Sequence, residues 1–84
     1  MTLDKIEAHL AANPIAGFTY ERAENGRLRL TGARRVVFFD PESGTNGYLA
    51  VFNAEGWRQH GAFVPSLGEF ETTLRRVCAE CDAA

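Results

Sequence analysis

Residues 18–64 read FTYERAENGRLRLTGARRVVFFDPESGTNGYLAVFNAEGWRQHGAFV, and this stretch decides the fold. It contains five short runs of β-branched and aromatic residues, and turn-forming residues separate each run from the next. Apolar residues at helical spacing flank the stretch on both sides, over residues 2–12 and 66–81. At the start of the second helix, Ser66 and Glu69 have the spacing of a capping box. The predicted element order is therefore α-β-β-β-β-β-α.

Short loops between the runs predict an antiparallel meander, because consecutive strands joined in this way pair directly with one another. The two helices most simply pack together on one face of that sheet. The expected fold class is α+β, a two-layer sandwich with the N- and C-terminal helices on one face. A chain of 84 residues has material for one core, so we expect a single domain over residues 1–84.

The loop at residues 24–26 determines which side chains of the first hairpin share a face. A two-residue turn there would place Arg22 opposite Arg29, and this pairing brings like charges together. A three-residue loop with its glycine in a bulge position instead places Tyr20 opposite Leu30 and Glu21 opposite Arg29. We therefore favour the three-residue loop.

The remaining turns extend this assignment across the sheet. A tight turn over residues 31–34, with glycine first, keeps residues 37 and 39 on the face that holds the leucines of the preceding strand. A three-residue loop over residues 54–56 places Trp57 opposite Asn53, whereas a two-residue loop would move Trp57 to the other face. The side chains expected to face inward are Phe18, Tyr20, Leu28, Leu30, Val37, Phe39, Leu49, Val51, Trp57 and Phe63.

The second face of the predicted sheet collects aromatic and basic side chains. The residues expected there are Val36, Phe38, Tyr48, Phe52, Arg58, His60 and Val64. Aromatic residues and arginine at the centre of a surface are typical of protein interfaces. Either a terminal helix crosses to cover this face, or the registers are off by one, or a second copy or a distinct protein binds there. The candidate protein-binding residues are Phe38, Tyr48, Phe52, Arg58 and His60.

The charge balance weakens the case for nucleic-acid binding. Eleven carboxylates outnumber nine cations, so the chain lacks the basic footprint of a dedicated duplex binder. An alternative is a nucleic-acid-associated module in which arginines contact a phosphate backbone. The residues that would serve it are Arg22, Arg27, Arg29, Arg34 and Arg35.

Cys78 and Cys81 form a Cys-x-x-Cys pair, which can be a redox centre or half of a metal site. The pair lies at the C-terminal end of a predicted helix, where the helix dipole disfavours a thiolate. Zinc would need two more ligands, from His9, His60 or a second subunit. We expect buried reduced thiols and neither a metal nor a cofactor, with a metal or redox protein as the alternative.

No phosphate-binding glycine motif occurs, and neither histidine has a nucleophile at a catalytic spacing. The sequence therefore predicts a non-enzymatic protein-binding module, comparable to phage-type inhibitors, immunity proteins or adaptors. Its expected partner is another protein or a second copy in a homodimer. No apolar run is long enough for a signal peptide or a membrane span, so the expected location is cytoplasmic.

Overall fold

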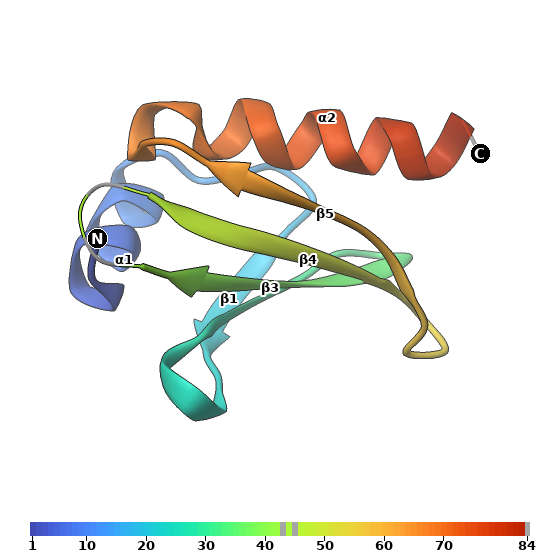
Figure 1. The fold of residues 1–84 in the computed structure, drawn as a ribbon, viewed down its shortest axis with the longest axis horizontal. Coiled ribbons are helices and arrows are strands. Elements are labelled where there is room, and N and C mark those ends of the chain that lie inside the picture. The colour runs from blue at the N-terminus through green and yellow to red at the C-terminus, as the bar shows by residue number, and fades with distance from the viewer. Residues whose placement is uncertain (43, 45, 84) are drawn as a thin grey trace.

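The computed structural model describes residues 1–42, 44 and 46–83, and it has the predicted order of elements (Figure 1). Helix α1 spans Leu3–Ala12, and helix α2 spans Phe70–Ala83. Two short 3-10 helices, η1 and η2, span Glu24–Gly26 and Leu67–Glu69. One antiparallel sheet has the order β1-β2-β3-β4-β5. Its strands are β1 (Thr19–Arg22), β2 (Leu28–Thr31), β3 (Arg35–Pro41), β4 (Gly47–Asn53) and β5 (Arg58–Val64).

Both helices pack on the same side of the sheet, here termed the helix face, and the opposite side is the outer face. Figure 1 shows α2 lying along β5, with the β4–β5 hairpin tip extending away from it. One core fills the space between the helices and the sheet, so the expected α+β meander is confirmed. Its buried hydrophobic residues are Ile6, Leu10, Ile15, Leu28, Leu30, Val37, Phe39, Leu49, Val51, Val64, Phe70, Leu74 and Val77.

Helix α1 begins and ends where the sequence predicts. The Thr2 hydroxyl caps it by accepting a hydrogen bond from the backbone N–H of Lys5 at 3.3 Å. Arg22 of β1 then ties the helix to the sheet, because its guanidinium binds Asp4 and donates to Glu7 at 2.7 Å. Neither helix is long and apolar enough to cross a membrane, among the residues that the structure describes.

The first hairpin has the predicted register. Tyr20 pairs with Leu30, and Glu21 pairs with Arg29, whose side chains also form an ion pair. The loop accommodates this register because Asn25 (φ 62°) and Gly26 (φ 71°) both adopt left-handed backbone conformations. Such conformations are accessible to glycine and asparagine and costly for most other residues.

The turn between β2 and β3 lies one residue further along than predicted. The Gly32 N–H donates to the Arg35 carbonyl at 2.9 Å, so residues 33 and 34 form the tip. This changes each β2–β3 pairing by two positions, and both faces keep their predicted residues because side chains alternate with period two. A Cβ on Gly32 would lie 2.9 Å from the Phe18 ring, so a side chain here would force that ring to move.

Strand β5 departs from the predicted register at Gln59. Phe52 pairs with Arg58 as expected, but Val51 pairs with His60, so Gln59 is an extra residue in a β-bulge. A one-residue shift moves every later side chain of the strand to the opposite face. The predicted faces are therefore wrong from His60 onward.

Two apolar side chains, Phe63 and Val64, change face as a result, and Trp57, which precedes the bulge, is more exposed than predicted. Phe63 was expected inward and lies on the outer face, where it is 64% exposed, while Val64 is buried on the helix face. Trp57 was also expected inward but is 73% exposed. It sits beside the tip of the β4–β5 hairpin, which extends beyond the part of the sheet that α2 covers (Figure 1).

The second helix also differs from its predicted bounds. No backbone N–H donates to the Ser66 side chain, and η2 replaces the first predicted turn, so α2 starts at Phe70. Its last described residue is Ala83, two residues past the predicted end. Before the long loop, β3 continues through Asp40 and Pro41, which pair with Tyr48 and Gly47 of β4. Positions 43 and 45 lie outside the described residues.

Replacing phenylalanine by alanine at two positions, one on each face of the sheet, tests the bulge. We expect Phe39→Ala to lower the free energy of unfolding by about 3–5 kcal/mol, because the Phe39 side chain is fully buried. Phe63→Ala should cost only about 0.5–1.5 kcal/mol, the contribution of its aromatic contact. Urea denaturation followed by circular dichroism measures both. Equal losses at the two positions would mean that β5 continues without the bulge.

Candidate functional site

No helix covers the outer face in the described part of the chain, so a helix crossing over it is ruled out there. The side chains of this face come from all five strands, and Arg27 lies over them from the loop before β2. They are Thr19, Glu21, Arg29, Thr31, Val36, Phe38, Asp40, Tyr48, Ala50, Phe52, Arg58 and Phe63, and Gly61 occupies a position among them. Four of the five predicted protein-binding residues are among them.

The aromatic side chains of the outer face form two pairs. Phe38 and Phe52 meet edge to face, with ring centroids 5.7 Å apart and an interplanar angle of 83°. Tyr48 and Phe63 meet in the same way at 5.3 Å and 79°. Mutual packing of this kind leaves three of the four rings half-buried without any covering element.

One arginine lies over each aromatic pair. The Arg27 guanidinium is 4.6 Å from the centroid of the Phe38 ring, and the Arg58 guanidinium is 5.6 Å from that of Tyr48. Arg58 also donates a hydrogen bond to the Tyr48 hydroxyl at 2.7 Å. Within the described residues, no carboxylate forms an ion pair with either arginine. Both positive charges are therefore balanced only by aromatic rings and neutral acceptors.

Gly61 lies against the Arg58 guanidinium. A Cβ at this position would overlap the Tyr48 hydroxyl and the Arg58 guanidinium. The hydrogen-bonded pair therefore lies flat across the glycine. Any side chain here would push the two polar groups outward.

His60 is the predicted site residue that the structure moves to the helix face. Its Nε2 is 2.6 Å from a carboxylate oxygen of Glu80 on α2, and its Nδ1 accepts the Gly61 N–H at 2.7 Å. Because Nδ1 accepts a hydrogen bond, Nε2 carries the proton and donates to Glu80. This hydrogen bond holds the pKa of Glu80 below its ordinary value. His60 therefore joins β5 to α2.

The cysteines lie beside this contact. A pocket of about 480 Å³ is lined by Gln59, His60, Glu80 and Cys81. Burial raises the pKa of the Cys81 thiol, and both ring nitrogens of His60 are already engaged. Cys78 and Cys81 are both half-buried free thiols. Among the described residues, no group of three or more His, Cys, Asp or Glu side chains is placed to hold a metal ion.

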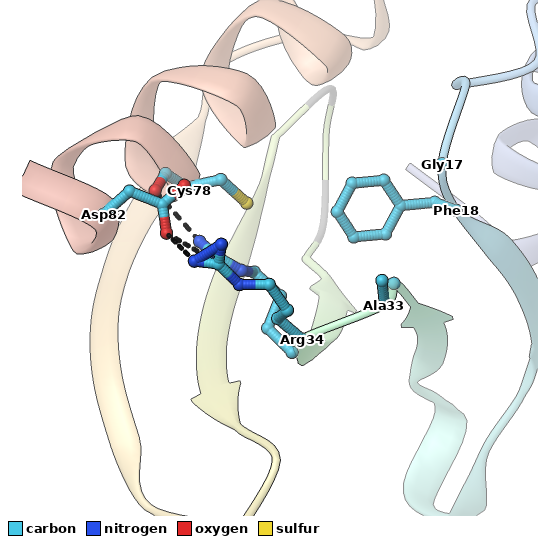
Figure 2. Close-up of a pocket in the computed structure, with 8 residues that line it drawn as sticks. Gly17, Phe18, Ala33, Arg34, Cys78 and Asp82 are labelled. Atoms are coloured by element: carbon cyan, nitrogen blue, oxygen red, sulfur yellow. Dashed lines mark hydrogen bonds and ion pairs between the residues drawn. The ribbon is translucent and has the colours of Figure 1, made fainter.

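The arginines considered for nucleic acid do not form one cluster. Arg27 and Arg29 lie near the start of β2, whereas Arg34 and Arg35 lie beyond its end. Figure 2 shows a pocket of about 210 Å³ at that second end, with Arg34 reaching towards Asp82 and the Phe18 ring on the far side. Arg35 binds Asp82 and donates to the Cys78 carbonyl at 2.9 Å, so its charge is used to hold the end of α2.

Sequence reasoning missed two members of the outer face. Phe63 was assigned to the inner face because the sequence did not predict the bulge. Gly61 was missed because a single glycine does not indicate which face of a strand it occupies. The one feature of the sequence that allows a bulge is the run of three polar residues at 58–60. Such a run does not alternate with apolar residues, so it favours neither register.

The thiol environment makes a measurable prediction. In the Cys78→Ala variant, alkylation of Cys81 by iodoacetamide should be slow near neutral pH, because the reactive thiolate forms only above the raised pKa. The midpoint of the rate against pH should lie above about 8.5, the value for a free cysteine. Urea-unfolded protein is the control and should react with an ordinary midpoint. A native midpoint below that of the unfolded protein would revive the redox alternative.

Comparison with known proteins adds no relative from which a role could be transferred. The chain matches no protein-family model, no curated protein and no solved structure. The candidate site therefore rests on the geometry and chemistry of the outer face.

Proposed function

We propose that this chain is a non-enzymatic protein-binding module that acts through its outer face, in the manner of a small inhibitor, immunity protein or adaptor. The observation that carries the proposal is a four-ring aromatic surface with no helix over it in the described residues. A single rigid layer of strands holds these rings. Their positions are therefore set before any partner arrives, which reduces the entropic cost of binding.

The composition of the outer face supports a protein partner. Aromatic residues and arginine carry most of the binding energy in protein interfaces, usually near the centre of the contact. Phe38, Tyr48 and Phe52 occupy the middle strands β3 and β4, and Arg58 stands beside them on β5. The most exposed ring of the face, Phe63, offers further apolar area at its margin.

The edges of the sheet are poorly suited to binding a partner strand. Strand β1 has only four residues, all exposed, and two of them are charged. At the other edge, the Gln59 bulge interrupts the regular spacing of β5. Short, charged or bulged edges disfavour strand addition. A partner is therefore better accommodated on the face of the sheet than along its edges.

The same face is less suited to stacking nucleic-acid bases. Single-stranded nucleic acids bind to exposed ring faces that lie along a positively charged groove. Here the guanidinium groups of Arg27 and Arg58 already lie over Phe38 and Tyr48. A base would have to displace a cation from each ring. These contacts favour a protein partner over a nucleic acid.

Phe52→Ala tests the proposal, because it removes a central ring that belongs to the outer face and not to the core. Immobilised wild-type and variant proteins are used to capture partners from an extract of the native host, and the captured proteins are quantified by mass spectrometry. We expect that the amount of a protein captured by the wild type falls by at least about tenfold with Phe52→Ala, as for an interface hot spot.

Tyr20→Ala is the matched control, since Tyr20 is also a partly exposed aromatic residue of the sheet but points to the helix face. This variant should capture the same protein as the wild type. Circular dichroism and urea denaturation confirm that each variant is folded. Equal capture by Phe52→Ala and Tyr20→Ala, or loss only when the variant unfolds, would contradict binding through the outer face.

A further inference from the structure

We infer that the partner of the outer face is a distinct protein with an acidic docking segment, in which Asp or Glu residues flank an apolar side chain. This inference rests on the proposed function and names the chemistry of the partner. It follows from the charges of the face, an unpaired donor, and the shape of the surface between the aromatic rings.

The outer face carries three arginines, although the chain as a whole has a formal net charge of −2. Of its three arginines, Arg29 forms an ion pair with Glu21. Asp40 also lies on this face and Glu24 lies at its margin beside Arg27, but Arg27 and Arg58 have no ion-pair partner among the described residues. Burying these two cations under a neutral surface would cost free energy with no compensation, whereas carboxylates on the partner would offset that cost.

Arg27 also carries a donor that the isolated chain does not satisfy. Its Nε is buried and has no hydrogen-bond acceptor in the described structure. Buried polar groups without a partner are uncommon in folded proteins, and each one is destabilising. A carboxylate that drew the guanidinium away from Phe38 would supply the missing acceptor. This unpaired donor adds to the case for an acidic partner at this end of the face.

A depression beside the first aromatic pair can hold an apolar side chain. It has a volume of about 380 Å³ and lies between β2, β3 and the β4–β5 hairpin. Its walls are formed by Arg29, Val36, Phe38, Phe52, Asn53, Ala54 and Gly56. An acidic segment with a leucine or phenylalanine could place that side chain here and its carboxylates near the flanking arginines.

A second copy of this chain is a poorer occupant. Two outer faces packed together would bring four arginines that have no ion-pair partner in the described residues into one interface, with Asp40 and the peripheral Glu24 of each copy as the carboxylates nearest to them. Like charges brought together in this way oppose association. Charge complementarity therefore favours a different, acidic protein.

The experiment selects binders from a displayed library of random 16-residue peptides on the wild-type protein, and the enriched peptides are then tested for binding to Phe52→Ala. We expect the enriched peptides to contain Asp or Glu on both sides of an aromatic or aliphatic residue. The affinity of one such peptide is then measured by fluorescence anisotropy. It should fall by about tenfold or more with Arg58→Glu or Arg27→Glu, and the fall should be larger at low salt.

Arg34→Glu is the matched control. It makes the same change in net charge at an exposed arginine beyond the other end of β2, and it should leave the affinity within about twofold of wild type, because long-range charge effects are screened by salt. Arg58→Gln removes the charge without reversing it and should give an intermediate loss. Gly61→Ala keeps every charge but displaces the Arg58 guanidinium, so it should also weaken the peptide.

The outcomes separate this inference from the proposed function. Enriched peptides that depend on Phe52 but carry no excess of Asp and Glu would overturn the acidic partner and leave binding through the face intact. If no peptide is enriched, or if Phe52→Ala does not weaken the enriched ones, both would be contradicted.

Two further measurements test whether a second copy or a nucleic acid occupies the outer face instead. Sedimentation velocity that shows a dimer abolished by Phe52→Ala would assign the face to a second copy. Binding of oligo-dT that is lost in the same variant would assign it to nucleic acid. Either result overturns the inference.

Discussion

The packing of Phe39 against Phe70 joins the two layers, and much of the structure depends on it. Both rings are fully buried, and they meet at a centroid distance of 5.0 Å and an interplanar angle of 70°. The Phe39 ring lies over Gly47, where a Cβ would overlap it, so β4 has to begin with a residue that has no side chain. Because Phe70 is the first residue of α2, this contact also determines where the helix begins on the sheet.

Because the hydrophobic core lies entirely on the helix face, few apolar residues remain to cover the outer face. A small domain buries only about 60% of the surface that its unfolded chain exposes, so one apolar layer between the helices and the sheet uses most of the available hydrophobic residues. The outer face is instead stabilised by its own contacts, ring against ring and arginine over ring. These contacts protect the aromatic side chains only partly, and they leave the surface available for a second molecule.

The pairing of side chains made the first hairpin predictable from the sequence, because only the loop over residues 24–26 avoided like charges and kept the apolar residues together. Phe38, Tyr48 and Phe52 were also placed on the correct face, because all three precede the bulge in the chain. The register of β5 was not predictable, because the polar residues beside Gln59 give no energetic preference for either face. His60 and Phe63 therefore exchanged sides.

The two arginines of the outer face differ in how firmly they are held. Arg58 donates to the Tyr48 hydroxyl and rests on Gly61, so its side chain has already lost much of its rotational freedom. Within the described residues, Arg27 stacks on Phe38 and its Nε has no hydrogen-bond acceptor. An arginine already fixed by a hydrogen bond loses little further entropy when a carboxylate binds, whereas one without such a bond can turn towards partners of different shape. If the outer face binds partners as proposed, those that differ near Arg27 can therefore share the same contact at Arg58.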